Sequence, residues 1–579
     1  MNSASMEMSG SAQSRTATSQ AQLDRSLALL SEKAPAFVKL SASERAALLR
    51  ACMPHLRRVA RGWVEAACKA KGHDINSPAA SEEWLGGPMV TMRALRLFVA
   101  ALEEIHRLGK PQLPAGAFRT GWDGRTEVQV FPYESIDKAM FGGFGCNLRI
   151  QRGLTELTVR ERQASHYSNK NAHPGISLIL GAGNVASIPP TDALHKLIVE
   201  GKVCMVKLNP VNEYLGPFYE QAFLPLVERG YLQFCYGGAD VGSYLSYHPL
   251  IEDVHITGSD RTHDLIVWGP PGPERERRMA SDDPLLKKQI TSELGCVTPV
   301  MVVPGEYSPS ELRFVAENVA SQIVNNASFN CNAAKVLVLS EGWSQREAFM
   351  THLRDILSTI PTRLAYYPGA NDRYETLTKG RTQIQRLGQQ EPNKLPWTII
   401  RGLDAGTKDP LWSTEPFCSI LSEVALPERD PAAFLRAAAK FSNDTLWGTL
   451  SCSLIIHPRT EQSSEVRNTL DVVVDELRYG VVAINHWPAV AYGAMTPPWG
   501  GHVSGTLKDV QSGIGFVHNT PMIEGIEKAV LRGPLTVFPK PPWFVTNRRS
   551  HRVAEKMVDF ELEPSFLKLP SILVDALRG

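Results

Sequence analysis

The sequence predicts an α/β protein built on parallel, doubly wound sheets. From about residue 175 onward, short apolar runs alternate with helical stretches: ISLIL (176–180), ALHKLIVEG, KVCMVKL and LGPFYEQAFLPLVERG. This alternation is typical of βαβ units, whose parallel strands carry helices on both faces. A second block of the same kind starts near VMVVPG and runs through KVLVLS to SLIIHP. Two α/β domains are therefore expected.

The first 110 residues are expected to be mostly helical after a polar tail. Residues 1 to about 20 are rich in serine and carry too little apolar surface to offset chain entropy, so a disordered tail is predicted there. They also lack the apolar stretch of a secretory signal. Ser41 to Glu44 has the pattern of a capping box, and a second helical stretch follows Pro88 and ends near Gly109.

Composition argues against several classes of protein. The chain has 579 residues, of which 43% are hydrophobic, and 61 basic residues balance 60 acidic ones. A net charge of +1 gives no electrostatic reason to expect nucleic acid as a partner. No window approaches the roughly 18 consecutive apolar residues of a membrane span. The nine cysteines form no CxxC pair, which argues against a disulfide framework or a metal site and fits a reducing cytoplasm.

Two predicted strand ends carry residues that suit nucleotide binding. GAGN (181–184) follows the first strand, but without the third glycine of the GxGxxG pattern it reads alone as a tight turn. Lys207 closes the next strand, where side chains point into the crevice that binds ligands in α/β sheets. There it could hydrogen-bond ribose hydroxyls, and the alternative is a solvated strand end.

Gly258 and Ser259 end a further predicted strand and lead into a helical stretch, RTHDLIVWG. Free N–H groups and the helix dipole both favour an anion at such a helix start. The pyrophosphate of a dinucleotide could therefore bind there.

Later motifs strengthen one resemblance by their order and spacing. They are TSELG (291–295), ASFNCNAAKVLV (327–338), TEPFCSIL (414–421), SNDTLWGTLSCSL, VVAINHW and PPWGGHVSGT. From about residue 40 to 540, the chain resembles the aldehyde dehydrogenase superfamily. The resemblance implies a Rossmann-like cofactor-binding domain, a catalytic α/β domain and a small bridging element that makes homodimers or homotetramers.

This resemblance suggests a division of the chain. Residues 21–295 would form the N-terminal helices and the cofactor-binding domain, with bridging strands at about 125–165. Residues 296–480 would form the catalytic domain, and 481–540 would return to the cofactor domain and supply an oligomerisation strand. Residues 541–579 form a C-terminal extension without a clear family counterpart. We expect it to pack on another subunit or over a substrate entrance.

The resemblance also assigns chemical roles. Cys331 would be the nucleophile that adds to an aldehyde, giving a thiohemiacetal and then a thioester. The side chain of Asn184 and the backbone N–H of Cys331 would stabilise the oxyanion. Glu293 would be the general base for hydrolysis of the thioester. Glu415 would hold the nicotinamide ribose, and Phe417 would pack against the nicotinamide.

Each assignment has a simpler alternative. Most cysteines are buried packing residues, and the other eight are interpreted in that way. Cys331 differs because its neighbours are polar: Ser328, Asn330 and Asn332. Glu293 could instead be a surface glutamate and Glu415 an ordinary loop carboxylate. If Cys331 is the nucleophile, we expect dipoles and the bound nicotinamide to lower its pKa.

The residues after Lys207 bear on the choice between NAD and NADP. Pro210 stands where NAD-specific relatives often carry a glutamate that binds the adenosine ribose. A 2′-phosphate would meet no charge repulsion there, so NADP could be accepted or preferred. Glu213 is near enough in sequence to compensate.

Three functions remain open from the sequence alone. The first is oxidation of a small-molecule aldehyde to a carboxylate. The second is an acylating relative in which coenzyme A, not water, resolves the thioester; many such enzymes lack the glutamate, so Glu293 favours the first. The third is a non-catalytic binding protein, against which the joint presence of the predicted site residues argues.

Overall fold

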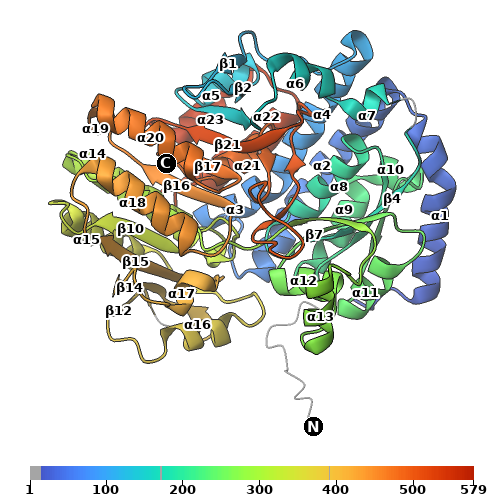
Figure 1. Cartoon of the computed structure of the whole chain (residues 1–579). Helices are drawn as coiled ribbons and strands as arrows, with labels where there is room; N and C mark the ends of the chain where they lie inside the picture. The colour runs from blue at the N-terminus through green and yellow to red at the C-terminus, as the bar shows by residue number, and fades with distance from the viewer. Residues whose placement is uncertain (1–14, 170–171, 390) are drawn as a thin grey trace.

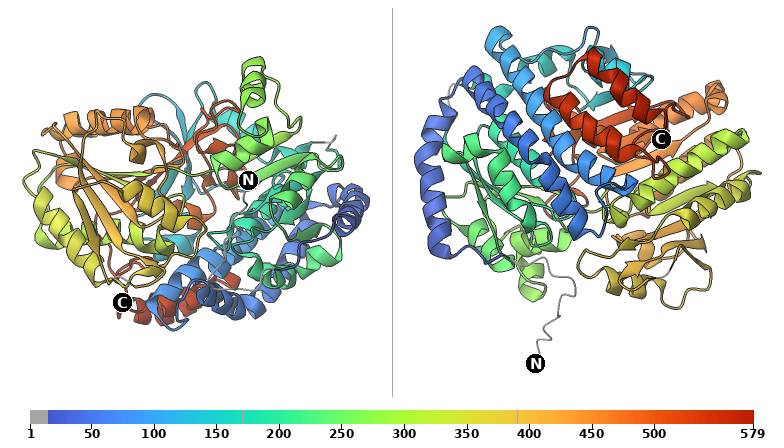
Figure 2. Two further views of the ribbon diagram at one scale, coloured as in Figure 1. Left: turned by 90° about the horizontal axis from the view of Figure 1, so that it is seen from below. Right: turned by 180° about the vertical axis from the view of Figure 1, so that it is seen from behind.

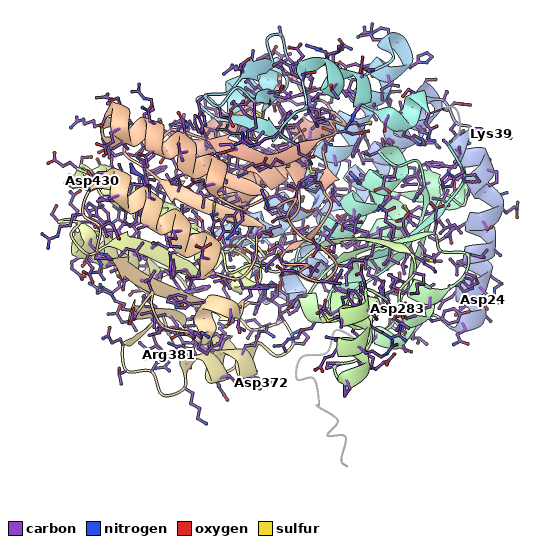
Figure 3. The ribbon with its side chains drawn as sticks, viewed as in Figure 1. Asp24, Lys39, Asp283, Asp372, Arg381 and Asp430 are labelled. Carbon is purple, nitrogen blue, oxygen red and sulfur yellow. The ribbon has the colours of Figure 1, made fainter. Side chains whose placement is uncertain are left out.

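The computed structural model describes residues 15–169, 172–389 and 391–579 and contains two large sheets, one in each half of the molecule (Figure 1). Both are mixed sheets with parallel cores and helices packed against them. The predicted α/β class is therefore confirmed. Charged side chains such as Asp24, Asp283 and Asp430 lie at the outline of both halves (Figure 3).

The smaller sheet has six strands, of which five are parallel. Its order is β19 (Gly513–Ile514), β8 (Gln289–Glu293), β7 (Asp253–Thr257), β4 (Ile176–Leu180), β5 (Val203–Lys207) and β6 (Leu232–Cys235). The chain runs outward from β4 to β6 and then returns to place β7 on the other side of β4. The point between β4 and β7 is a topological switch point, where such sheets form ligand crevices.

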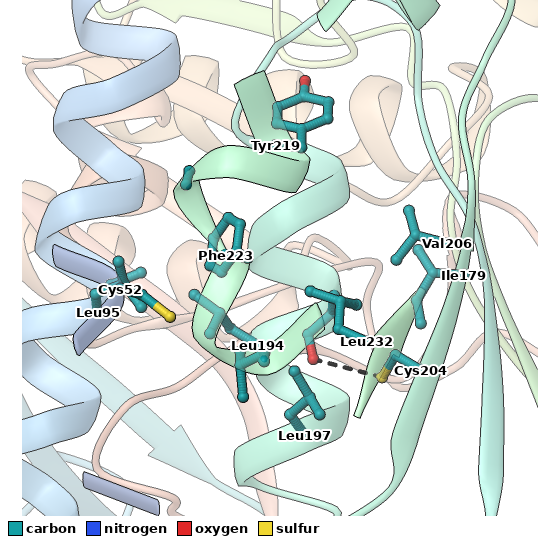
Figure 4. Packing of buried hydrophobic residues seen from close by; sticks show 14 of the residues in the cluster. Cys52, Leu95, Ile179, Leu194, Leu197, Cys204, Val206, Tyr219, Phe223 and Leu232 are labelled. Atoms are coloured by element: carbon teal, nitrogen blue, oxygen red, sulfur yellow. Dashed lines mark hydrogen bonds between the residues drawn. The ribbon is translucent and has the colours of Figure 1, made fainter. Parts of the chain in front are cut away.

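Helices on both sides of the smaller sheet share one apolar core. Leu194 and Leu197 of α8 (Ile188–Ile198) belong to the same buried cluster as Tyr219 and Phe223 from the α9 region (Gly216–Ala222) and Cys204 of β5 (Figure 4). These side chains are at most 1% exposed. Leu95 of α4 (Val90–Leu108) and Cys52 of α2 (Ala42–Ala70) join the same core, so the N-terminal helices are part of this domain.

The larger sheet has eleven strands. Its order is β1 (Phe118–Thr120), β2 (Thr126–Phe131), β3 (Gly145–Ile150), β21 (Ile526–Arg532), β17 (Val481–Ile484), β16 (Ser451–Ile455), β9 (Pro299–Val302), β10 (Val336–Ser340), β15 (Ile420–Leu426), β14 (Trp397–Leu403) and β12 (Ile384–Leu387). The strands from β21 to β14 are parallel. Two helix pairs pack into different apolar clusters: α14 (Pro309–Val324) with α15 (Arg346–Thr359), and α18 (Pro431–Asp444) with α20 (Ser464–Glu476).

The chain crosses between the sheets differently from the predicted division. The strands expected at 125–165, β2 and β3, extend the larger sheet of the same chain through β21. The segment 481–540 is expected to return to the cofactor domain and to supply an oligomerisation strand; of its strands, β19 joins the smaller sheet, while β17 and β21 lie in the larger one. The four residues of β17 are all buried. An apolar strand pattern indicates burial but not which sheet receives the strand.

The N-terminal helices begin where the sequence places them. The capping box before α2 is present, since the backbone N–H of Ser41 donates to the Glu44 carboxylate at 2.8 Å and the Ser41 hydroxyl accepts from the Glu44 N–H at 3.3 Å. Of the predicted disordered tail, residues 1–14 lie outside the described part. Residues 15–20 are ordered, contrary to that prediction, because Arg15 and Thr18 donate backbone hydrogen bonds to Glu213 and Tyr236.

The C-terminal extension packs on the N-terminal helices of its own chain. Helix α22 (Ser550–Leu562) lies beside α2 and α4, and α23 (Leu569–Ala576) packs on α22, as the view from behind shows (Figure 2). By length and composition alone, the helical stretch Pro78–Leu108 could cross a membrane, but 78% of its most apolar window is buried inside the protein. Burial of this kind is typical of a core helix.

Candidate active site

Three residues from different parts of the chain line one cavity of about 150 Å³. Asn184 follows β4, Glu293 is the last residue of β8, and Cys331 follows the short helix η4 (Asn325–Ser328) at the larger sheet. The first two belong to the smaller sheet, beside its switch point. Loops from both sheets therefore meet at this cavity, and the three predicted catalytic residues all line it.

The thiol of Cys331 contacts the carboxylate of Glu293. Its Sγ donates to Glu293 Oε1 at 3.3 Å. Cys331 is also the only cysteine of the nine that is not fully buried. The other eight pack inside the protein, as expected. Cys331 is thus the cysteine in the described structure that combines partial access with an adjacent base.

Both groups have raised pKa values. Burial, reinforced by the charge of Asp192, raises the pKa of Glu293 to about 7. Burial and the carboxylates of Glu293 and Glu415 raise the pKa of the Cys331 thiol well above its ordinary value. The protein's own interior and charges thus raise the thiol pKa, and the lowering expected from a bound nicotinamide stays a prediction. The residue beside the thiol is an acceptor for its proton, not a cation that would stabilise the thiolate.

The loop that carries Cys331 adopts an unusual backbone conformation. Asn326, Ala327 and Ser328 have φ angles of 53°, 54° and 68°, in the left-handed region that non-glycine residues rarely adopt. Lys335 stabilises this turn, since its buried ammonium donates to the Ser328 carbonyl at 2.9 Å. Such backbone strain persists where surrounding contacts over-determine it, and it clusters at functional sites.

Both the side chain and the backbone carbonyl of Asn184 make hydrogen bonds that fix its position. Its side-chain Nδ2 donates to the Phe329 carbonyl at 2.9 Å, two residues before Cys331. Its backbone carbonyl accepts from Lys71 Nζ at 3.1 Å, Asn326 Nδ2 at 3.0 Å and the Tyr366 hydroxyl at 3.3 Å. A primary amide has two N–H groups, so one remains for a substrate oxygen after the contact with Phe329.

Lys71 is the residue at this site that the sequence did not single out. Besides the Asn184 carbonyl, its ammonium donates to Glu83 at 2.8 Å and to the Asn326 side chain at 2.9 Å. It is 5% exposed and follows the last turn of α2. A lysine at the C-terminal end of a helix normally lies in solvent, where it interacts favourably with the helix dipole. The residues around Lys71 in the sequence therefore carry no signal of this role.

Three of the predicted cofactor residues lie at the carboxyl edge of the smaller sheet. Lys207 ends β5, is 9% exposed, and has a pKa lowered by burial. Gly258 donates its N–H to the Glu293 carbonyl at 3.0 Å, which connects this loop to the predicted general base. Ser259 caps α12 (Asp260–Trp268) by accepting from Thr262 N at 3.2 Å. All three lie outside the cavity lining that contains Cys331.

Glu415 and Phe417 approach from the larger sheet. Glu415 lies against Gly295, where an added Cβ would come within 2.2 Å of its Oε2. Its buried Oε1 has no hydrogen-bond partner among the described residues, and burial raises its pKa to about 7. Phe417 packs on Phe329 with ring centroids 5.8 Å apart. These two residues therefore adjoin the nucleophile loop without lining the cavity.

A buried acceptor without a partner is the feature expected where a ligand supplies the donor. Glu415 Oε1 could accept from a ribose hydroxyl, while Lys207 and the capped start of α12 offer donors across the switch point. The described residues contain no group of three or more His, Cys, Asp or Glu side chains arranged to hold a metal ion. The unpartnered Glu415 oxygen, Lys207 and the start of α12 together fit the ribose and phosphate groups of a dinucleotide.

Comparisons with known proteins agree with this architecture. No protein-family model matches the chain. A curated Staphylococcus haemolyticus protein named "putative aldehyde dehydrogenase" is 24% identical over 211 residues, which span 36% of this chain and 40% of that protein.

Solved structures match over most of the chain. The glyceraldehyde-3-phosphate dehydrogenase GapN of Methanocaldococcus jannaschii, complexed with NADP, has a TM-score of 0.57 and 13% identity over 90% of this chain and 96% of that one. Aldehyde dehydrogenase 21 of Physcomitrella patens, complexed with the product succinate, has a TM-score of 0.59 and 14% identity over 89% and 90%. An NAD-dependent aldehyde dehydrogenase of Sinorhizobium meliloti has a TM-score of 0.59 and 16% identity over 91% and 88%.

Two α/β sheets with a thiol, a carboxylate and an amide between them define a two-domain protein of the α/β class. More specifically, the chain has the fold of the aldehyde dehydrogenase superfamily. The resemblance inferred from the sequence motifs is confirmed at this level.

Proposed function

We propose that the protein oxidises an aldehyde to a carboxylate with NAD or NADP as the hydride acceptor. The contact between Cys331 Sγ and Glu293 Oε1 at 3.3 Å is the observation that carries this proposal. It pairs a nucleophile with a base inside a cavity that also contains the amide of Asn184. The matched sequence covers less than half of the curated relative, so the activity rests on the site itself.

The first half of the reaction would form a covalent adduct. Glu293 accepts the thiol proton, and the sulfur of Cys331 bonds to the aldehyde carbon while the carbonyl π electrons move to oxygen. The second N–H of Asn184 and the backbone N–H of Cys331 are the donors for this oxyanion. Loss of one such donor typically costs about 2.7–4 kcal/mol of barrier. When bound, the nicotinamide would supply the acceptor for the hydride that leaves the former aldehyde carbon as the oxyanion becomes a carbonyl again, so that the adduct becomes a thioester.

The second half would hydrolyse the resulting thioester. Glu293, after losing the proton it took from the thiol, accepts a proton from water as the water oxygen bonds to the acyl carbon. The carbon–sulfur bond then breaks, Glu293 returns the proton to the sulfur, and the acid product loses its own proton to solvent and leaves as the carboxylate. With a pKa of about 7, Glu293 is well matched to proton transfer near neutral pH.

The cofactor would bind across the switch point. Lys207 would hold the adenosine ribose, the loop at Gly258 and Ser259 the pyrophosphate, and Glu415 the nicotinamide ribose. Glu213, which could have replaced the carboxylate missing at position 210, accepts the Arg15 N–H at 2.8 Å. Solved proteins of this fold include one complexed with NADP and one described as NAD-dependent, which supports either cofactor here.

The decisive test follows reduced-cofactor absorbance with a panel of aldehydes, with and without coenzyme A. We expect a carboxylate product without coenzyme A and no turnover by Cys331→Ala. Cys296→Ala is the matched control, because this cysteine is fully buried and makes no contact with Glu293 among the described hydrogen bonds. Turnover that requires coenzyme A would overturn the hydrolytic reaction, and an active Cys331→Ala would overturn the nucleophile.

We also propose that the protein acts as a homodimer or homotetramer. Light scattering of the purified chain measures this directly, and a monomer at micromolar concentration would contradict it.

A further inference from the structure

The cavity beside Cys331 has walls from widely separated segments. Apolar side chains dominate them: Met89, Val90, Phe141, Trp487, Trp543 and Met557. Two of these, Trp543 and Met557, come from the C-terminal extension (541–579). None of the sequence motifs that resemble the family lies in this extension. The extension is therefore part of the active-site cavity, on the same chain as the nucleophile.

The charged residues in the wall are already paired with one another. Lys71 contacts Glu83 at 2.8 Å, and both side chains are at most 6% exposed. Arg93 contacts Glu561 at 2.9 Å and Asp137 at 2.8 Å. A buried charge that is fully paired offers little to a charged ligand, because binding would have to break the existing pair.

The third wall carboxylate is paired in the same way. Glu82 contacts Arg363 at 3.1 Å and also accepts the N–H of Asn326 at 2.8 Å. Apart from Glu293, whose pKa is raised by burial and by Asp192, every charged side chain that lines the cavity thus has an ionic partner in the protein.

The C-terminal wall is fixed by ion pairs to the N-terminal helices. Glu561 of α22 contacts Arg93 at 2.9 Å and Arg96 at 2.7 Å. Earlier on the same helix, Asp559 pairs with Arg57, and Glu555 pairs with Arg61 at 3.1 Å. Met557 lies on the same helix and is 5% exposed. These contacts fix the position of the C-terminal wall. They therefore limit the length of a substrate that fits in the cavity between Cys331 and this wall.

We infer that the substrate is an uncharged aldehyde with an apolar group the size of an aromatic ring or a six-carbon chain, and that Trp543 and Met557 set this limit. The inference rests on the proposed aldehyde oxidation. The size follows from the cavity volume of about 150 Å³, since an apolar cavity of about that volume binds benzene. The exclusion of charge follows from the paired ions.

The test compares kcat/KM across straight-chain aldehydes from two to twelve carbons, benzaldehyde, succinic semialdehyde and glyceraldehyde 3-phosphate. We expect kcat/KM to rise about fourfold for each methylene up to about six carbons and then level off or fall. Benzaldehyde should match hexanal, and both charged aldehydes should be at least tenfold poorer. A preference for either charged aldehyde, or for acetaldehyde, would overturn the inference.

Two variants test the role of the wall. Trp543→Ala and Met557→Ala should move the optimum to longer chains, with at least a threefold gain for decanal relative to hexanal. Leu567→Ala is the matched control, because this leucine of the same extension is 91% exposed. An unchanged chain-length profile in both cavity variants, with folding verified by circular dichroism, would contradict the assignment of the wall.

A binding measurement separates this inference from the proposed function. Calorimetric titration of Cys331→Ser with hexanamide and with succinamate probes the cavity without turnover. Tighter binding of hexanamide supports the apolar cavity even if no aldehyde is oxidised, in which case the proposed function alone fails. Tighter binding of succinamate, or no binding of hexanamide at millimolar concentration, overturns the inference alone.

Discussion

At the scale of single residues, the charge of Glu293 acts on the thiol in two opposing ways. Its carboxylate can accept the thiol proton, but its negative charge also helps to raise the pKa of Cys331. In the proposed reaction, Glu293 would therefore accept the thiol proton in the first step, and its negative charge would then disfavour the thiolate that results. This opposition gives a specific expectation for its amide variant.

Glu293→Gln should separate the two halves of the reaction. Removing the charge lowers the pKa of the Cys331 thiol, so one equivalent of reduced cofactor should still form rapidly. Hydrolysis loses its general base, and the steady-state rate should fall by about 10²–10⁴-fold. Stopped-flow absorbance measures both phases. A steady-state rate equal to that of the parent protein would show that Glu293 is not the base.

The same variant should also change the pH dependence of stability. Folding raises the pKa of Glu293 from 4.5 to about 7, so the folded state binds more protons in this interval. Its contribution is most favourable below about pH 4.5 and is lost as the pH rises through 7. Glu293→Gln should therefore be more stable than the parent at pH 8, by up to about 3 kcal/mol, and lose this advantage at pH 5. Urea unfolding at both pH values checks this, and a difference independent of pH would refute it.

Lys71 should act as a positioning residue for Asn184 and the nucleophile loop. Lys71→Met removes three hydrogen bonds, and a displacement of about 1 Å can cost about 10²-fold in rate. We expect kcat to fall with little change in KM, and Lys71→Arg to recover part of it. Lys69→Met, an exposed change on the same helix, is the control. Equal losses in kcat for Lys71→Met and Lys69→Met would contradict the positioning role.

At the scale of elements, α22 depends on one carboxylate. Glu561 is 1% exposed and pairs with both Arg93 and Arg96 of α4. Glu561→Ala leaves two arginines without this partner, and breaking a buried pair typically costs about 3–5 kcal/mol. Glu563→Ala, two residues later with its side chain 84% exposed, should cost less than about 0.5 kcal/mol. Equal unfolding midpoints for the two variants in denaturant would show that α22 is not anchored through Glu561.

The order of the strands explains why two weak motifs become one site. The loop after β4 carries Asn184, and the loop after β7 carries Gly258 and Ser259. Because β4 and β7 are neighbours in the sheet although β5 and β6 separate them in sequence, both loops emerge on the same side of the switch point. β8 then lies beside β7 and brings Glu293 to the same edge.

At the scale of the whole molecule, the active site exists only where the two halves meet. Asn184, Glu293 and Lys207 come from the smaller sheet, while Cys331 and Glu415 come from the larger one. A dinucleotide that spans these groups would stabilise the folded protein over the unfolded chain. At 100 times its Kd, a ligand adds about 2.7 kcal/mol to the free energy of unfolding.

Thermal unfolding in the presence of NAD and NADP should therefore reveal the cofactor. We expect at least one of them to raise the Tm, and Lys207→Ala to reduce that increase through loss of the ribose contact. Lys39→Ala, at the exposed outline of the molecule, should leave the increase unchanged (Figure 3). No increase with either dinucleotide at millimolar concentration would count against a cofactor site at this edge.

The sequence alone determined the fold class and the principal site residues. Apolar alternation predicted strands 176–180 and 203–207, and motif order singled out Cys331, Glu293 and Asn184. These signals are local, because the pattern of apolar residues that indicates a buried strand or a helix lies in residues that are close together in the sequence. The roles of these residues remain predictions, but their convergence on one cavity is observed.

Only the tertiary structure decided what depends on distant contacts. It showed that Lys71 joins Asn184 to Asn326, that β17 and β21 enter the larger sheet, and that Trp543 and Met557 line the cavity. It also showed that burial and the carboxylates of Glu293 and Glu415 raise the pKa of the Cys331 thiol. Each of these facts depends on which side chains lie together in the low-dielectric interior. The local sequence pattern does not encode the distances between segments that are hundreds of residues apart.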